Sequence, residues 1–243
     1  MAQVGKAGFT EVETFGYSVD KGFFGTSVHD FKSMLDDNGL KATSNHFDFN
    51  SMIKDGSTDL VKAYVETANH LGSEYITVPY VVQELRGVSG DDYKKLAEQV
   101  NKFGELCKAG GLKLAYHNHD FEFTKFGDTN GYEILLNETD KNLVDFEMDI
   151  YWVVAAGADP IAYLKKYPNR FKLCHVKDLI KTSTGHESCI LGKGTIDFKN
   201  ILYVGAQNGL KFHIIEQEAY TGTTELDCAK ENAIVLNNLD WRA

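Results

Sequence analysis

Short apolar runs alternate with longer amphipathic stretches along the whole chain, which is typical of β/α units and a parallel sheet. The apolar runs predict seven strands, at Glu11–Tyr17, Lys41–His46, Tyr75–Tyr80, Leu112–His117, Leu143–Ile150, Phe171–His175 and Lys211–Glu216. The amphipathic stretches predict helices at Val28–Asn38, Ser57–Leu71, Asp92–Ala109, Gly131–Glu138, Asp159–Lys166, Phe198–Asn208 and Asp227–Asn238.

Residues at the helix ends support these assignments. Ser57 is a residue type that caps helix N-termini, and we expect it to cap the second helix. Gly39, Gly110 and Gly209 each follow a predicted helix, where glycine readily adopts the left-handed conformation that ends one. Gly192-x-Gly194 lacks the Lys-Ser/Thr that follows the glycines of a phosphate loop, so we expect a turn there, with Asp197 capping the next helix.

The number of strands bears on the fold class. A closed (β/α)8 barrel needs eight strands, whereas Ala2–Gly8 has the pattern of the tail of a helix. We therefore expect an α/β fold of the TIM (β/α)8 barrel type, a single domain over residues 1–243 that is N-terminally incomplete, with the first strand missing from this chain. Truncation is favoured over an open seven-stranded sheet, because proteins usually avoid an exposed sheet edge.

Composition narrows the function. The chain has 243 residues, 43% of them hydrophobic, and a formal net charge of −10, which disfavours a nucleic-acid partner. No apolar run is long enough to span a membrane, and residues 1–4 lack the features of a signal peptide. Since the start is expected to be incomplete, location stays open: cytoplasmic if the N-terminus is complete, periplasmic if a signal peptide has been removed. The widely spaced cysteines, Cys107, Cys174, Cys189 and Cys228, predict reduced and mostly buried thiols.

Four predicted strands end at side chains that bind metals or titrate: His117, Asp149, His175 and Glu216. The carboxyl ends of parallel strands meet at one face of a barrel, so distant residues can share one ion there. A lone histidine at a strand end is more often structural, but the joint placement favours one divalent metal. His117 could instead orient a substrate. Imidazole with carboxylate suits Mn, Co, Zn or Fe.

Further polar residues lie two positions from these ligands and are expected to share their face: His119, Glu147 and Lys177. A desolvated Lys177 beside a cation would have a depressed pKa and serve as catalytic acid or base, with His119 as the rival. For substrate binding we predict Glu147, His46, Tyr80 and Trp152, the last as a sugar-stacking wall with Tyr151. Polar caps and core aromatics without a catalytic role are the alternative.

Five segments carry a resemblance to a known family: Lys113–His119, Phe146–Trp152, His175–Asp178, Gly192–Asp197 and Ile214–Glu218. Together they resemble the sugar phosphate isomerase/epimerase family, the xylose-isomerase-like TIM barrels. The resemblance implies a metal held by Glu, Asp, His and Glu, of which the last three become Asp149, His175 and Glu216. This chain departs at the first position, where His117 replaces the glutamate.

The implied chemistry is the formation of an enediolate from a sugar, keto-sugar or cyclitol, with the divalent metal as Lewis acid. Relatives with two metal-binding glutamates are implied to epimerise with one base on each face. Here only Glu216 of that pair remains, so a one-base elimination by a lyase or dehydratase and an isomerisation both stay open.

Two other classes are weighed against this enzyme. An endonuclease of the same superfold would need more ligands and a basic surface, which the acidic composition speaks against. A degenerate, carbohydrate-binding barrel is kept open by the missing strand and the altered ligand. The expected partner is a small carbohydrate, and a homo-oligomer is left open.

Overall fold

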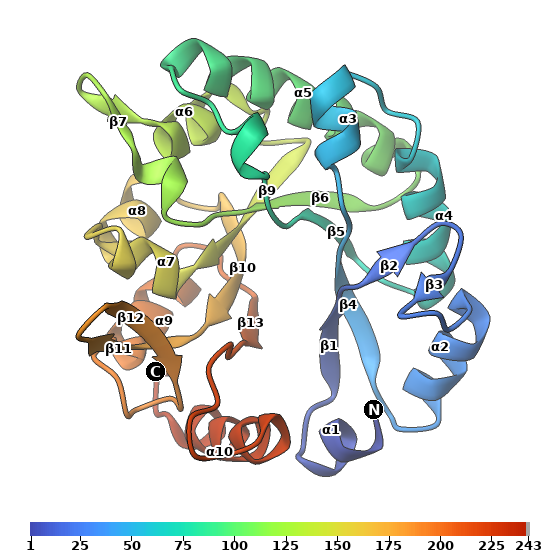
Figure 1. The fold of residues 1–243 in the computed structure, drawn as a ribbon, viewed down its shortest axis with the longest axis vertical. Helices are drawn as coiled ribbons and strands as arrows, with labels where there is room; N and C mark the ends of the chain where they lie inside the picture. The colour runs from blue at the N-terminus through green and yellow to red at the C-terminus, as the bar shows by residue number, and fades with distance from the viewer. Residues whose placement is uncertain (242–243) are drawn as a thin grey trace. The chain divides into compact units, whose positions relative to one another are not determined.

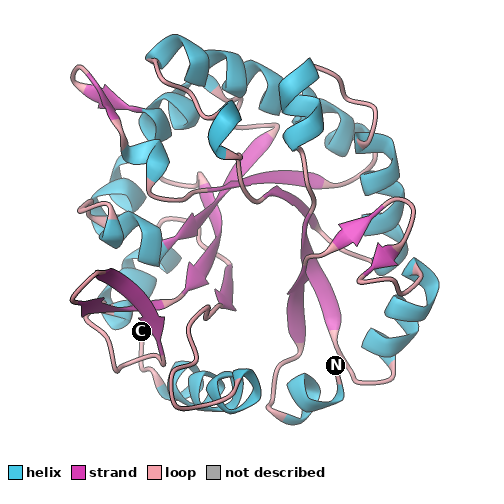
Figure 2. Cartoon of the chain, in the orientation of Figure 1, coloured by secondary structure: helices cyan, strands magenta, loops and turns pink. Residues whose placement is uncertain are grey.

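The computed structural model describes residues 1–241, and its strands and helices alternate along the chain as the hydrophobic pattern predicts (Figure 2). The chain divides into two compact units. Residues Thr10–Phe146 form the first, while Ala2–Phe9 and the residues from Glu147 onward form the second.

The first unit contains parallel strands with helices packed beside them. Its main strands are β1 (Glu11–Thr14), β4 (Lys41–His46), β5 (Tyr75–Val78) and β6 (Lys113–His117), paired in that order and all parallel. Its helices are α2 (Val28–Asp36), α3 (Asn50–Asp55), α4 (Val61–Leu71), α5 (Gly90–Ala109) and α6 (Gly131–Glu138), with short 3-10 turns η1 (Gln83–Leu85) and η2 (Phe121–Phe123). Figure 1 shows α4 and α5 alongside β4, β5 and β6.

The second unit repeats the same alternation. Its main strands are β10 (Phe171–Val176) and β13 (Phe212–Ile215), which pair in parallel. Its helices are α1 (Ala2–Lys6), α7 (Ile150–Ala155), α8 (Pro160–Lys166), α9 (Phe198–Gln207) and α10 (Glu225–Asn238). Strand β9 (Val144–Asp149) has residues in both units. The strand order β1-β4-β5-β6-β9-β10-β13 confirms, for the described residues, the predicted number of seven.

Several local predictions are confirmed. Gly8, Gly39 and Gly209 have φ of 96°, 65° and 96°, values that suit glycine after a helix. Asp197 caps α9 by accepting a hydrogen bond from the backbone N–H of Asn200. All four cysteines are free, and three of them are buried.

Other local predictions are wrong. Ser57 does not cap α4, which begins at Val61 after an N-cap at Leu60 that makes no side-chain bond. The strand predicted to end at Ile150 ends one residue earlier, at Asp149, and the unpredicted helix α7 follows, because the Asp149 carboxylate accepts a hydrogen bond from the Trp152 N–H and caps the helix.

Three short antiparallel hairpins were also not predicted. They are β2–β3 (Tyr17–Ser18 and Gly22–Phe23), β7–β8 (Lys125–Phe126 and Thr129–Asn130) and β11–β12 (Asp178–Thr182 and Gly185–Cys189). None of the helices in the described part of the chain is both long and apolar enough to cross a bilayer.

Candidate functional site

Asp149, His175 and Glu216 come together in the second unit, at the carboxyl ends of β9, β10 and β13. Their ligand atoms lie within 4.8 Å of one another. His175 Nδ1 lies 3.0 Å from Glu216 Oε2 and 3.9 Å from Asp149 Oδ2. The structure therefore brings together three of the four predicted ligands, from three different strands, as a group that could hold a metal ion.

Lys177 lies among the same carboxylates. Its Nζ is 2.9 Å from Asp149 Oδ2 and 2.7 Å from Glu216 Oε2, and Glu218 Oε1 follows at 3.5 Å. The residue is fully buried, and the rings of Tyr151 and Trp152 lie 5.0 and 5.2 Å from the ammonium. The two aromatic residues thus surround a cation, which lowers the cost of burying it.

These contacts decide the direction of the pKa shifts. Burial alone would lower the pKa of Lys177, but Asp149, Glu216 and Glu218 outweigh it, so the pKa is raised. The predicted depression of this pKa supposed a metal ion beside Lys177 and stays a prediction, whereas the raised pKa follows from the three carboxylates that face the ammonium. Burial would raise the pKa of Glu216, yet His175 and Lys177 hold it well below its usual range. Burial, the largest influence on Asp149, raises its pKa.

The charge of this cluster suits a cation. Glu147 and Asp149 are completely buried, and Glu147 Oε2 lies 3.5 Å from His175 Nε2. With Glu216 and Glu218, four carboxyl groups lie beside Lys177 or His175. Buried charges need compensation, and the carboxyl groups outnumber the two basic side chains in this cluster. The mixed imidazole and carboxylate donors therefore fit a divalent transition metal in both type and charge.

Polar side chains behind β13 hold the segment that carries Glu216. Gln217 Oε1 accepts a hydrogen bond of 2.8 Å from the amide of the buried Asn232. Ser188 Oγ accepts bonds from the backbone N–H groups of Glu218 and Ala219, at 2.8 and 2.9 Å. The chain after the strand is thus fixed by bonds from β12 and α10, which restricts the positions that Glu216 can take.

Asp178 organises the loop after β12. Its carboxylate accepts four backbone hydrogen bonds, from the N–H groups of Leu179, Gly192, Gly194 and Ile196, at 2.8 to 3.2 Å. A Cβ atom at Gly194 would lie 2.2 Å from Asp178 Oδ1. The Gly192-x-Gly194 segment is therefore a turn around a carboxylate, as predicted, and its second glycine permits the close approach.

The remaining predicted site residues lie in the first unit. His46, at the end of β4, lies 2.8 Å from Glu13 of β1 through Nε2 and Oε2. The ring of His117 lies 5.3 Å from that of His46 and 5.1 Å from that of His119. This unit thus has its own group of histidines at strand ends, with a carboxylate that the sequence prediction missed. In the four-residue strand β1, Glu13 comes one residue before the buried Thr14. A strand this short has too few alternating residues for the sequence to show that Glu13 would lie beside His46.

Glu122 was also missed. It is completely buried, and it accepts hydrogen bonds from the Tyr116 hydroxyl at 2.9 Å and from the His119 N–H at 2.8 Å. Burial raises the pKa of Glu122 to about 7, although these two hydrogen bonds lower it. Tyr132 donates to the neighbouring Asn118 side chain at 2.9 Å. Hydrogen bonds of the Tyr116 and Asn118 side chains therefore hold the Tyr116–His119 segment in place.

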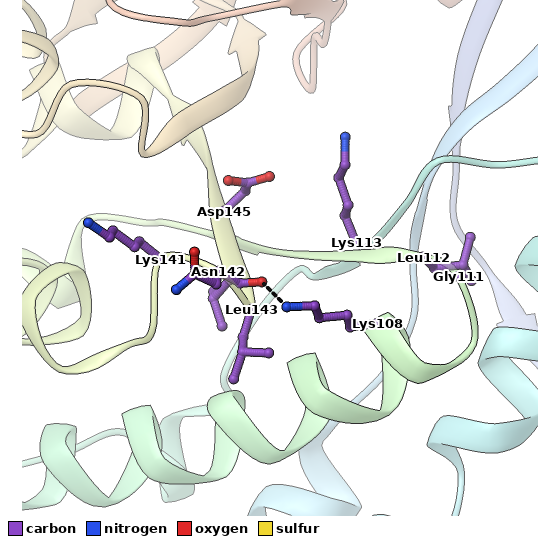
Figure 3. Close-up of a pocket in the computed structure, with 9 residues that line it drawn as sticks. Lys108, Gly111, Leu112, Lys113, Lys141, Asn142, Leu143 and Asp145 are labelled. Atoms are coloured by element: carbon purple, nitrogen blue, oxygen red, sulfur yellow. Dashed lines mark hydrogen bonds between the residues drawn. The ribbon is translucent and has the colours of Figure 1, made fainter.

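A pocket of about 400 Å³ lies elsewhere in the first unit, at the amino ends of β6 and β9. Figure 3 shows that the Lys113 and Lys141 side chains point apart, while Lys108 donates to the Asn142 carbonyl at 3.4 Å. Lys113 is paired with Glu74 at 2.5 Å. These ammonium groups do not converge, and we assign no function to the pocket.

Comparison with known proteins decides the family. The family model described as xylose isomerase-like TIM barrel matches residues 1–240. The chain belongs to the xylose isomerase-like TIM barrel family. This confirms the expected fold class and the resemblance that the five sequence segments carried, and one family model covers both units.

Named relatives of this xylose isomerase-like barrel are enzymes. It is 28% identical over 210 residues to inosose dehydratase of Clostridium perfringens, a match that covers 74% of this chain and 66% of that protein, just under two thirds. A sugar phosphate isomerase/epimerase structure from Parabacteroides distasonis is 29% identical, with a TM-score of 0.85, covering 99% of this chain and 87% of that one. An IolI protein with a bound zinc atom, 18% identical with a TM-score of 0.74 over 96% of this chain and 90% of that one, shares the fold.

Proposed function

We propose that the protein is a divalent-metal-dependent enzyme that enolises a sugar, keto-sugar or cyclitol. The observation that carries the proposal is the convergence of Asp149, His175 and Glu216 within 4.8 Å, in a buried cluster where carboxyl groups outnumber basic side chains. The similarity to an inosose dehydratase and to a sugar phosphate isomerase/epimerase supports a carbohydrate substrate.

In this proposal, Asp149, His175 and Glu216 hold the ion, which as a Lewis acid would polarise the substrate carbonyl when bound. Its identity is proposed as Mn, Co, Zn or Fe, from the mixed nitrogen and oxygen donors. His117, which belongs to the other unit, stays a prediction as a fourth ligand.

The residues of this chain would then move the proton. Glu216 keeps its negative charge at neutral pH because its pKa is lowered. We propose that this carboxylate takes the proton from the carbon beside the carbonyl. Lys177 keeps its positive charge because its pKa is raised. We therefore assign Lys177 an electrostatic part, stabilising negative charge that develops on substrate oxygen. His119, Glu147, His46, Tyr80 and Trp152 stay proposed as residues that bind substrate or transfer protons.

The same residues suit two outcomes. Return of the proton to the neighbouring carbon gives an isomer, whereas its transfer to a β-hydroxyl, which leaves as water, gives a dehydrated ketone. Glu216 is the one glutamate among the proposed metal ligands, so a single base is proposed. A one-base dehydratase therefore stays the alternative, and the similarity to an inosose dehydratase supports it.

The test begins with the metal content of the purified protein, by elemental analysis, in wild type, Asp149→Ala and Glu216→Ala. Asp197→Ala, which removes a helix-capping carboxylate in the same unit, is the matched control. We expect about one equivalent of a transition metal in wild type and in the control, and its loss in the two site variants. A folded protein that takes up no metal after reconstitution would refute the proposed mechanism.

The second part measures enolisation directly. In D₂O, exchange of the hydrogen beside the carbonyl is followed by proton NMR in a panel of D-fructose, D-ribulose and a keto-inositol. Exchange that needs the metal and is lost in Glu216→Ala supports the proposal, and new signals distinguish an isomer from a dehydrated product. Metal binding without exchange on any member would count against enolisation of these three substrates.

A further inference from the structure

Arg86 is held in an aromatic setting next to His119 in the first unit. Its guanidinium carbon lies 3.9 Å from the centre of the Phe121 ring and 5.1 Å from that of the Tyr80 ring. His119 packs on the same two rings, stacked on Phe121 at 5.8 Å and edge-on to Tyr80 at 4.9 Å. A cation and an imidazole thus share one pair of aromatic side chains.

The guanidinium is fixed in place by hydrogen bonds. Arg86 Nε donates to the Val81 carbonyl at 3.1 Å, and one terminal nitrogen donates to the Tyr80 hydroxyl. Asn50 in turn holds this segment, since its side chain accepts from the Val82 N–H at 2.9 Å and donates to the Tyr80 carbonyl at 3.3 Å. The fork of Arg86 is therefore oriented before any ligand arrives.

Its charge is not balanced by an acidic neighbour. Within the described residues 1–241, no carboxylate forms an ion pair with Arg86, although the chain carries 35 acidic residues against 25 basic ones. Arg86 is half-buried and Tyr80 is 39% exposed. A stacked guanidinium uses two of its five N–H groups here, and those that remain suit the paired oxygens of a carboxylate or phosphate.

The location agrees with a substrate contact. Tyr80 follows the end of β5 by two residues, and His119 follows the end of the neighbouring β6 by two. Ligands of parallel α/β folds bind at the carboxyl ends of the strands. Arg86 thus lies on the functional edge of its own unit.

We propose that Arg86, with the Tyr80 hydroxyl, forms an oxyanion site of the first unit, which binds a carbohydrate that carries a phosphate or carboxylate group. This inference rests on the proposed function for the carbohydrate and on Arg86 alone for the charge. A hydroxyl-rich neutral sugar would leave the guanidinium with poorly matched partners.

The first experiment observes the cation itself. The chain has three arginines, so a ¹⁵N-labelled sample gives few Nε–H signals, and an Arg86→Met variant identifies that of Arg86. We titrate metal-free protein with inorganic phosphate and with acetate, which separates this test from that of the metal centre. A saturable shift of the Arg86 signal, with Arg170 unmoved, is expected. No saturable shift of Arg86, or an equal shift of Arg170, overturns the inference.

The second experiment distinguishes the two sources of the oxyanion. Calorimetry compares D-fructose, D-fructose 6-phosphate and D-fructuronate, which share a skeleton and differ at C6. In wild type we expect the phosphate or the carboxylate to bind at least 10-fold more tightly than the neutral sugar. Arg86→Met, which keeps apolar contact with Phe121, should reduce that preference below twofold, and Arg86→Lys should keep part of it. A preference that survives Arg86→Met overturns the inference. Arg170→Met, at the amino end of β10, is the control.

Discussion

The Nζ atom of Lys177 lies 2.7 Å from Oε2 of Glu216, an oxygen that also lies 3.0 Å from Nδ1 of His175 in the candidate metal centre. The ammonium therefore neutralises part of the charge that a metal ion would neutralise. Breaking a buried pair by removing one partner leaves an uncompensated charge, which is costlier than the pair itself. Stability and metal binding should thus be coupled in this protein through Lys177.

We predict that Lys177→Met lowers the free energy of unfolding of the metal-free protein by about 3 kcal/mol or more. Added Mn²⁺ should restore a larger part of the stability in the variant than in wild type, because the ion then supplies the positive charge that Lys177 no longer provides. Urea unfolding with and without chelator measures both effects. Lys113→Met removes an exposed, paired lysine and should cost less than about 1 kcal/mol. Equal losses in both variants would contradict the argument.

The buried carboxyl of Glu122 predicts a dependence of stability on pH. Its pKa of about 7 lies above the value of 4.5 that it has when exposed, so between these values the folded state holds the proton and the unfolded state releases it. Stability from this group is complete below about pH 4.5 and is lost as the pH rises to about 7, by about 3 kcal/mol.

Glu122→Gln isolates this contribution, since glutamine has a similar shape and does not titrate. The difference in unfolding free energy between wild type and variant should shift in favour of the variant from pH 5 to pH 8. Denaturant unfolding at several pH values measures it. A difference that does not change with pH would show that Glu122 is ionised in the folded protein throughout.

Asp178 and Asp197 both accept hydrogen bonds from backbone N–H groups, but they differ in the number of bonds. Asp178 accepts four backbone N–H bonds and Asp197 accepts one that caps α9. Asp178→Ala should therefore destabilise by about 3 kcal/mol or more, and Asp197→Ala by about 1 kcal/mol. The Asp178 variant should also be cleaved faster by protease within residues 190–196. Similar losses in the two variants would mean that water replaces the carboxylate in the loop.

The thiols should react slowly in the native protein. Burial raises the pKa of Cys107 to about 12, and burial with nearby Asp178 raises that of Cys189 to about 11, so little thiolate exists at pH 8. We expect four thiols to react with Ellman's reagent in guanidinium without reductant. In native protein the half-exposed Cys189 should react first, and Cys189→Ser should remove that phase. Fewer than four reactive thiols after unfolding would refute the prediction of reduced cysteines.

The strands and the fold class were predictable because their signals are local. β4, β5 and β6 follow apolar runs, and each lies within one residue of its predicted start or two of its predicted end. The end of β9 was less clear, since Ile150 and the apolar residues after it fit both a strand and a helix. The hydrogen bond from the Trp152 N–H to Asp149 decided for α7, and a pattern of hydrophobicity does not contain that bond.

The candidate site divides in the same way. By itself the sequence determined which strand ends carry imidazole or carboxylate groups, because strand periodicity and the parallel arrangement are properties of the chain pattern. Tertiary structure alone decided the direction of the Lys177 pKa, the burial of Glu122 and, among residues 1–241, the lack of an acidic partner for Arg86. Each of these depends on neighbours from other strands and on exclusion of water, and electrostatic energy is set by distance and burial in three dimensions and not by position along the chain.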